Sequence, residues 1–229
     1  MKRVPNDELL DSDAGTPAEI TGSFADLHLV NRWFGGNATS RAMIERVASE
    51  LGKKSLSLLE VAAGSGDVPR AVQKSLSRRG IQLEVTLLDR AASHLAAGDQ
   101  GDGMRTVVGD ALALPFHDES FDLVACNLFA HHLSPAQLPL FVNEGLRVCR
   151  TAVLINDLVR GGWHLASVYA ALPFFRSRVT RHDALASVRQ AYTPAEMRKL
   201  LATTKAARIE IDRHYFFRMA AVIWKTTSA

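Results

Sequence analysis

The sequence has few of the features that mark secreted or membrane proteins. It contains two cysteines, Cys126 and Cys149, and both lie in apolar or helical contexts. We therefore expect no disulfide framework, and the thiols indicate a reducing compartment. No charged and then apolar signal segment opens the chain, and no apolar run approaches the roughly 20 residues of a membrane span. The longest run, residues 166–175, is broken by Pro173. These absences predict a soluble, cytoplasmic protein.

The chain also lacks a strong overall charge, since its formal net charge is +3. Residues 1–30 hold 2 Lys and Arg against 6 Asp and Glu, whereas residues 176–229 hold 11 against 4. A solvated basic face is the simplest interpretation. A nucleic-acid-binding surface would combine basic residues with exposed aromatics or a known module, and neither is evident. We expect no nucleic-acid partner and at most peripheral contact with an anionic membrane.

A composition of 47% hydrophobic residues suits one α/β domain with an appendage. The main feature is the apolar run 56–61, which shows no alternation and is typical of a strand buried on both faces of a parallel sheet. Gly64 and Gly66 follow it, and a helix-like segment, 68–76, comes next. Glycine lets a ligand approach the backbone, and a helix N-terminus presents free N–H groups. The pattern therefore predicts a nucleotide-type ligand site.

Two residues distinguish this stretch from that of proteins with the dinucleotide-binding pattern G-x-G-x-x-G. Pro69 stands where the third glycine is expected, and Glu60 would repel a pyrophosphate but attract a cationic amino-acid group. The stretch resembles motif I of the class I S-adenosylmethionine-dependent methyltransferases, in the G-x-G-D variant that ends at Asp67. That family more often has glycine in place of Ala62, a mild departure because alanine is nearly as small.

A second acid follows the next apolar strand. Asp89 lies 23 residues past Gly66 (89 − 66), close to the spacing of a ribose-binding acid from the glycine turn. A carboxylate there can accept hydrogen bonds from both ribose hydroxyls. The simpler interpretation is an N-cap for a helix over residues 90–97, and the two roles are compatible.

Later segments match further motifs of the same family. Gly109-Asp110-Ala111 follows a third strand, and the family's acid at this place binds the adenine amino group. The strand 121–127 and the segment 127–133 resemble motif IV of the branch that acts on small molecules, without the Asn/Asp-Pro-Pro-aromatic pattern of enzymes that methylate nucleic-acid bases or glutamine. The resemblance implies S-adenosyl-L-methionine as cofactor and S-adenosyl-L-homocysteine as product. It implies the following cofactor-binding residues: Glu60, Ala62, Gly64, Gly66, Asp67, Asp89, Arg90, Gly109, Asp110, Ala111, Asn127 and Leu128.

The resemblance covers roughly residues 40–225. It implies an α/β, Rossmann-like sheet of seven strands, mostly parallel with an antiparallel last hairpin, with helices on both faces and an N-terminal helical lid. We expect residues 1–37 to form the N-terminal segment and lid, and 38–229 the methyltransferase domain with a substrate-side insertion at 158–192. Residues 1–21 are polar and predict a surface or loosely ordered segment.

Local patterns also predict element boundaries. They predict an amphipathic element over 24–36 and a following helix capped by Asn37 or Thr39. They predict a helix that is opened by the capping box 134–137 and whose start is delayed by Pro139. They also predict a turn at 149–152 before strand 153–155, and a closing hairpin of 209–211 and 215–224.

Methyl transfer from a sulfonium needs positioning and removal of a proton from the acceptor. A phenol or quinol has a pKa near that of tyrosine, ~10, so a histidine is a plausible base. His131 and His132 follow the fourth strand, and His182 with its neighbour Asp183 is a second candidate, so we take these three histidines as catalytic candidates. No His/Cys/Asp cluster has metal-ligand spacing, and we expect no metal site.

The motifs look most like the methyltransferases of ubiquinone and menaquinone biosynthesis and of phenolic polyketides. This implies a small, aromatic or lipophilic acceptor methylated on oxygen or carbon, in a protein that can oligomerise. Substrate-binding candidates come from the lid, the end of the fifth strand and the insertion: Trp33, Asp157, Arg160 and Trp163. A nicotinamide-dependent oxidoreductase, disfavoured by Pro69 and Glu60, and a catalytically silent cofactor-binding protein stay open as alternatives.

Overall fold

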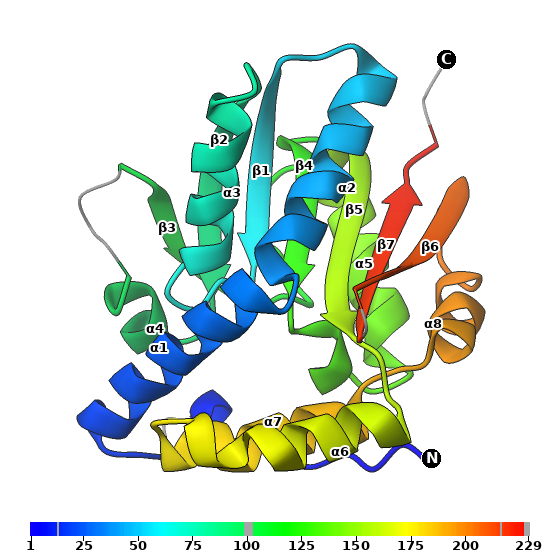
Figure 1. The fold of residues 1–229 in the computed structure, drawn as a ribbon. Coiled ribbons are helices and arrows are strands. Elements are labelled where there is room, and N and C mark those ends of the chain that lie inside the picture. Colours follow the sequence, from blue (N-terminus) through cyan, green and yellow to red (C-terminus); the bar gives the residue numbers. More distant parts are fainter. Residues whose placement is uncertain (13, 99–102, 216, 227–229) are drawn as a thin grey trace.

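The computed structural model describes all residues except 13, 99–102, 216 and 227–229. Its seven strands form one sheet in the order β3-β2-β1-β4-β5-β7-β6 (Figure 1). The strands are β1 (Ser55–Val61), β2 (Gln82–Asp89), β3 (Arg105–Val108), β4 (Phe121–Asn127), β5 (Cys149–Leu158), β6 (Arg208–His214) and β7 (Arg218–Trp224). The first five are parallel, and β7 runs antiparallel to both β5 and β6. The predicted fold class is confirmed.

Helices cover both faces of the sheet and one of its ends. They are α1 (Pro17–Trp33), α2 (Gly36–Leu51), α3 (Asp67–Ser77), α4 (Ala92–Ala96), α5 (Gln137–Val148), α6 (Gly162–Ala171), α7 (Arg178–Gln190) and α8 (Pro194–Leu201), with short 3₁₀ turns η1 (Leu10–Ser12), η2 (Ala130–His132) and η3 (Leu172–Phe174). Among the described residues, no helix is both long and apolar enough to cross a membrane.

The largely apolar sequence of β1, which shows no alternation, is explained by burial on both faces. Leu56 and Leu58 pack in a cluster with residues of α2 and α3, whereas Leu59 and Val61 pack in a second cluster with residues of α5. Successive side chains of a strand point to opposite faces, so each face of β1 needs its own apolar set.

Several predicted boundaries are corrected by the structure. Helix α1 begins at Pro17, where Thr16 and Glu19 form a capping box, and not at residue 24. Helix α2 begins at Gly36 with Gly35 as its N-cap, so neither Asn37 nor Thr39 caps it. Strand β5 begins at Cys149, so residues 149–152 form its first part and no turn. The early start of β5 arises because pairing with β4 extends the strand beyond its most apolar stretch.

Two further boundaries also shift. Ser134 and Gln137 exchange the reciprocal hydrogen bonds of a capping box, but α5 begins only at Gln137, with Pro139 in its first turn. At this place the backbone N–H that proline lacks is not needed, because the amides of the first turn have no hydrogen-bond partner within the helix. The closing hairpin is longer on β6 and shorter on β7 than predicted, and residue 216 of its second predicted strand lies outside the described residues.

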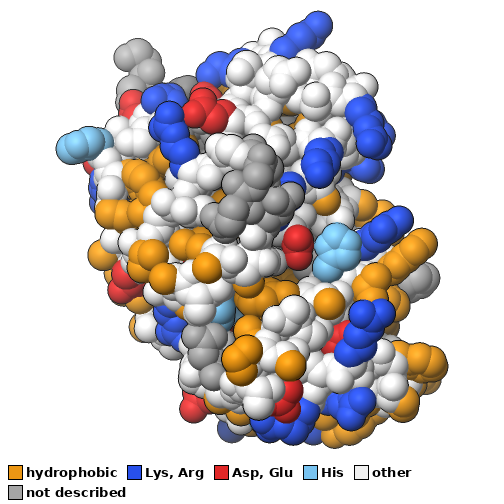
Figure 2. All heavy atoms as spheres, turned by 90° about the vertical axis from the view of Figure 1, so that its left-hand side faces the viewer, with side chains coloured by type: hydrophobic (Ala, Val, Ile, Leu, Met, Phe, Trp, Pro, Cys, Tyr) orange, Lys and Arg blue, Asp and Glu red, His pale blue; other side chains and the backbone are white. Residues whose placement is uncertain are grey.

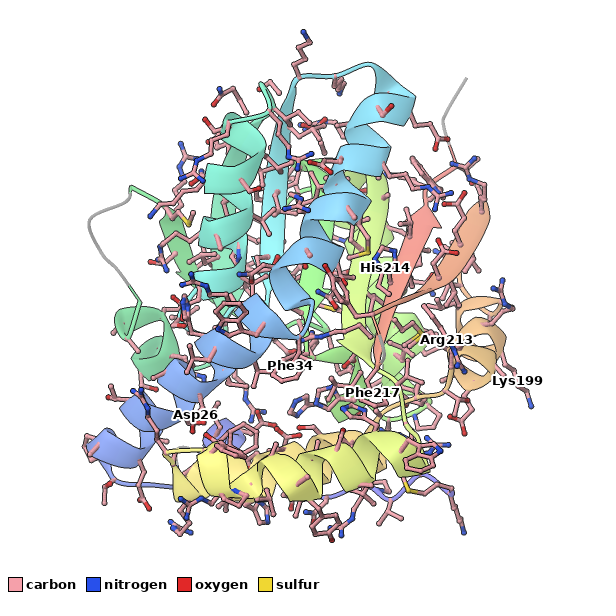
Figure 3. The ribbon with its side chains drawn as sticks, viewed as in Figure 1. Asp26, Phe34, Lys199, Arg213, His214 and Phe217 are labelled. Carbon is pink, nitrogen blue, oxygen red and sulfur yellow. The ribbon has the colours of Figure 1, made fainter. Side chains whose placement is uncertain are left out.

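The predicted insertion forms a layer across the carboxyl ends of the parallel strands. Figure 1 shows α6 and α7 lying below these ends, with α1 crossing beside them. Asp26 of α1 is buried and accepts hydrogen bonds from the backbone N–H groups of Arg176 and Ser177, just before α7 (Figure 3). The insertion and the N-terminal helix are therefore tied together at the carboxyl ends of the strands.

Candidate active site

A cavity of about 680 Å³ lies at the carboxyl ends of β1, β2 and β4. Its walls come from the sheet edge, from α1, from the insertion and from the N-terminal segment. The face in Figure 2 shows hydrophobic side chains gathered around a hollow near its centre. Ligand pockets of α/β proteins typically lie at this edge of the sheet, and their volumes are about 300–1,000 Å³.

The turn after β1 forms one wall through its backbone. Ala62, Gly64 and Gly66 all have positive φ, at 54°, 55° and 75°. Glycine adopts such angles freely, whereas alanine does so at a cost of about 1–2 kcal/mol. The family's preference for glycine in place of Ala62 therefore concerns backbone conformation, which corrects our argument from size. Gly66 does not line the cavity; a Cβ atom there would lie 2.6 Å from Leu87 Cδ1.

Glu60 lies on the cavity wall at the end of β1 and is 3% exposed. The side-chain amide of Asn127 donates a hydrogen bond of 2.5 Å to its Oε1. Burial raises the pKa of Glu60 to about 7, and the hydrogen bond from Asn127 only partly offsets this effect. A positively charged group beside Glu60 would favour its ionised form.

Asp89 is the last residue of β2, and its carboxylate binds backbone N–H groups of two loops at the end of the sheet. Its Oδ2 accepts a hydrogen bond of 2.8 Å from the backbone N–H of Gly64, and its Oδ1 accepts one of 3.0 Å from Ala91. Helix α4 begins at Ala92 with Ala91 as N-cap, so the predicted N-cap role of Asp89 is wrong in detail. The side chain nevertheless fixes both loops, and each carboxylate oxygen can accept a further hydrogen bond.

Most of the predicted cofactor-binding residues are brought together at the cavity. Asp110 lines it beyond Asp89, with one carboxylate oxygen bound to the backbone N–H of Leu112 at 2.8 Å. The cavity is lined by these members of the predicted set: Glu60, Ala62, Gly64, Asp67, Asp89, Arg90, Gly109, Asp110, Ala111, Asn127 and Leu128. They lie at the ends of four strands, β1 to β4, because parallel strands place their carboxyl ends on one edge of the sheet.

His131 and His132 line the cavity from η2, with their ring centroids 4.3 Å apart. His131 is 1% exposed; its Nδ1 lies 2.6 Å from Asp157 Oδ1, and its Nε2 lies 3.4 Å from Glu8 Oε1. Burial alone would lower the pKa of His131, but the carboxylates of Asp157 and Glu8 raise it to about 10. A protonated imidazole accepts no proton, so this geometry speaks against His131 as the base.

His132 is bound from two sides by acids of the N-terminal segment. Its Nδ1 lies 2.8 Å from Asp11 Oδ2, and its Nε2 lies 3.8 Å from Glu8 Oε2. Glu8 is buried, and its pKa is lowered because the two histidines outweigh the opposite effect of burial. This corrects the prediction that residues 1–21 form only a surface or loosely ordered segment. No local pattern marks Glu8 or Asp11 as site residues, since their partners lie far along the chain.

Besides Gly66, five predicted site residues lie outside the cavity lining. Trp33 and Trp163 are 69% and 87% exposed, and His182 is exposed and pairs with its neighbour Asp183. Arg160 is buried but donates hydrogen bonds to Ala191 and Glu196, near the start of α8. Asp157 lies behind His131 and acts on the cavity through it. The insertion and α1 contribute other residues to the lining, among them Phe24, His28, His164, Val168, Phe175 and Val188.

Comparisons with known proteins agree with this geometry. Residues 58–152 match the family model described as "Methyltransferase domain". The chain is 34% identical over 116 residues to the ubiquinone/menaquinone biosynthesis C-methyltransferase of Roseobacter denitrificans, covering 48% of this chain and 43% of that protein. It is 35% identical over 85 residues to the demethylmenaquinone methyltransferase of Staphylococcus aureus, covering 35% and 34%. The chain thus matches less than half the length of these curated relatives.

Solved structures of methyltransferases share the fold at low sequence identity. The plantazolicin methyltransferase BpumL, solved in complex with a pentazolic desmethylPZN analog and SAH, has a TM-score of 0.69 at 14% identity and covers 96% of this chain and 95% of its own. The magnesium protoporphyrin IX methyltransferase of Synechocystis, with bound SAH, has a TM-score of 0.56 at 12% identity and covers 84% of each chain. The chain therefore has the class I methyltransferase fold, its residues 58–152 match the methyltransferase domain, and part of the chain is similar to the ubiquinone and menaquinone C-methyltransferases.

Proposed function

We propose that this protein is an S-adenosylmethionine-dependent methyltransferase that acts on a small aromatic or lipophilic acceptor of the phenol or quinol type. The observation that carries the proposal is the single cavity wall on which Glu60, the Gly64 turn, Asp89 and Asp110 follow one another. Glu60 would bind the amino-acid ammonium, and the Gly64 turn would let the cofactor approach the backbone closely. Asp89 would bind the ribose, and Asp110 would bind the adenine. The names of the relatives support the quinol-like acceptor.

The part of the cavity lined by α1 and the insertion suits the acceptor. Apolar side chains of α1 and the insertion, including Leu27, Val168 and Phe175, line the cavity, and Glu8 and His132 supply a polar end. The sulfonium supplies a methyl group by in-line displacement, with a neutral thioether as leaving group. The chain's own residues must orient the acceptor hydroxyl and take up its proton. A phenolate is a better nucleophile at oxygen and at its ring carbons, so the same proton removal serves O- and C-methylation.

Ligand binding tests the cofactor assignment directly. S-adenosylhomocysteine at 100 times its dissociation constant is expected to stabilise the fold by about 2.7 kcal/mol, because it binds only the native state. NAD at the same concentration is expected to change the melting temperature little, since Glu60 faces the place of a pyrophosphate. Differential scanning fluorimetry measures both. A clear shift with NAD and none with S-adenosylhomocysteine would exclude the proposal in favour of a nicotinamide enzyme.

The raised pKa of Glu60 predicts a pH-dependent cofactor affinity. With a pKa of about 7, Glu60 ionises as pH rises from 6 to 8, and the affinity for S-adenosylhomocysteine is expected to increase roughly tenfold because only the ionised carboxylate attracts the ammonium group. Titration calorimetry at several pH values measures this trend. In Glu60→Gln, which keeps an acceptor oxygen for Asn127, the trend should disappear; an unchanged slope would show that another group titrates.

A further inference from the structure

Three side chains of the cavity wall direct ligand atoms to a common point. They are Glu8, His131 and His132, and one ligand atom from each lies within 4.8 Å of the other two. The Nε2 atoms of His131 and His132 lie 3.4 and 3.8 Å from the two carboxylate oxygens of Glu8. Ligand bonds of about 2.0–2.2 Å give such separations between neighbouring ligands of one metal ion.

Both imidazoles are oriented as metal-binding histidines are. His131 has its Nδ1 on Asp157 at 2.6 Å, and His132 has its Nδ1 on Asp11 at 2.8 Å. Metal-binding histidines usually donate their second ring N–H to a carboxylate or a carbonyl, which fixes the tautomer and directs the other nitrogen to the ion. Here two separate carboxylates do so for two adjacent histidines, and both Nε2 atoms face Glu8. A metal ion there would take the place of the Nε2 proton that His131 otherwise carries.

Glu8 is also held in place. Its Oε1 accepts hydrogen bonds from Ser187 at 2.7 Å and from Gln190 at 2.8 Å, whereas Oε2 is the oxygen nearest to His132 Nε2. The adjacent backbone is bound too, because the N–H groups of Leu9 and Leu10 donate to Asp183. A ligand whose position is fixed before binding loses little conformational entropy on binding.

One ligand atom lacks a hydrogen bond of good geometry. The Nε2 of His131 is buried and lies 3.4 Å from Glu8 Oε1, an ion-pair contact that does not meet hydrogen-bond geometry, and it has no hydrogen bond among the described residues. Buried polar atoms nearly always form hydrogen bonds, and one that does not points to an ion or a water at that place. Three carboxylates, those of Glu8, Asp11 and Asp157, contact the two histidine rings directly. The guanidinium groups nearby bind backbone carbonyls or lie behind the site: Arg3 binds His131 O, Arg90 binds Asp11 O, and Arg218 interacts with Asp157.

We propose that Glu8, His131 and His132 form a binding site for one divalent first-row transition-metal ion such as Zn²⁺ or Fe²⁺. Two imidazoles and one carboxylate are a donor set that these ions accept with coordination positions left open. The open positions would face the cavity, because all three side chains line it. The site is assembled from distant parts of the chain, which is why no metal-ligand spacing appears in the sequence.

The role of the ion rests on the proposed function. The acceptor hydroxyl would bind at an open position, where the ion lowers its pKa and its proton passes to solvent. The ionised oxygen, or a ring carbon made nucleophilic by it, then forms the new bond to the methyl carbon as the carbon–sulfur bond breaks, and the thioether leaves neutral.

Metal binding can be measured without cofactor or acceptor. Untagged protein is treated with a chelator, dialysed against micromolar Zn²⁺ and analysed for bound metal; we expect one ion per chain. Glu8→Gln, which keeps the shape of the side chain, and His132→Ala are expected to lose it, with circular dichroism confirming the fold. Asp11→Asn, which leaves all three ligands in place, is expected to weaken binding about 10–100-fold.

Matched controls are available on the surface. Glu84 is exposed on β2, and His117 is exposed in the loop before β4, so Glu84→Gln and His117→Ala should bind Zn²⁺ like the parent protein. Binding of Co²⁺ followed by visible absorption gives a second readout, because the bands depend on coordination by imidazole and carboxylate. The bands should vanish in Glu8→Gln and remain in Glu84→Gln.

Two results would overturn the metal site. One is the absence of stoichiometric Zn²⁺ and Co²⁺ binding in the parent protein, and the other is binding that survives Glu8→Gln and His132→Ala. The cluster would then be an ion-pair network in which Glu8 and Asp157 hold His131 protonated. S-adenosylhomocysteine binding, measured on the same samples, separates this failure from failure of the proposed function. If the protein binds S-adenosylhomocysteine but no metal, only the metal-site proposal is rejected.

Discussion

Replacing His132 by alanine is expected to lower methyl-transfer turnover by about 10²–10⁴-fold, the usual cost of losing the group that acts on the proton. The side chain lies at the polar end of the cavity between Asp11 and Glu8, where the acceptor hydroxyl is expected. Affinity for S-adenosylhomocysteine should change little, because the residue lies outside the Glu60, Asp89 and Asp110 wall. Turnover with a panel of phenols and quinols, cofactor titration and melting temperature measure the three effects.

Two comparisons make this experiment decisive. His117→Ala removes an exposed histidine and should leave turnover unchanged. Turnover of the parent protein and of His132→Ala is measured after chelation and again with added Zn²⁺. If His132 is a metal ligand, Zn²⁺ should restore turnover in the parent protein but not in the variant. If His132 is a free base, Zn²⁺ should change the turnover of neither protein. If His132→Ala keeps near-full activity from pH 6 to 9, the acceptor arrives ionised and the enzyme only positions it.

Asp89→Ala is expected to weaken binding of S-adenosylhomocysteine by about 100-fold or more, since two charge-assisted hydrogen bonds to ribose hydroxyls are worth roughly 1.5–3 kcal/mol each. The structure adds a second cause. The carboxylate also binds the backbone N–H groups of Gly64 and Ala91, so its loss frees the turn that approaches the cofactor. Titration calorimetry measures the affinity, and the melting temperature without ligand reports the structural part.

Graded variants separate the two causes. Asp89→Asn keeps one acceptor oxygen and should retain part of the affinity, whereas Asp212→Ala, an exposed aspartate on β6, should retain all of it. An unchanged affinity in Asp89→Ala, with a lowered melting temperature, would mean that Asp89 only fixes the turn. The ribose would then be bound by other groups of the wall.

The sequence predicted the sheet, through its apolar strands and its resemblance to a known family, and it placed the predicted cofactor-binding acids at one end of that sheet. An unalternating apolar run such as 56–61 can be stable only between two layers, and an acid or glycine directly after such a strand must lie at its carboxyl end. Parallel strands bring these ends together whatever the loops do. For that reason Glu60, Asp89 and Asp110 could be placed on one edge before the fold was known, and the structure brings them to one cavity.

Tertiary structure alone decided which residues of helices and loops meet the cavity. Trp33 and Trp163 are large and apolar, yet packing turns them to solvent, while Phe24 and Phe175 face inward. Glu8 reaches His131 only because the N-terminal segment is held by Asp183, Ser187 and Gln190 of α7. Contacts between segments this distant depend on how the layers pack, and no local propensity or spacing encodes them. The polar end of the cavity, and with it the proposed metal site, could therefore be found only in the folded chain.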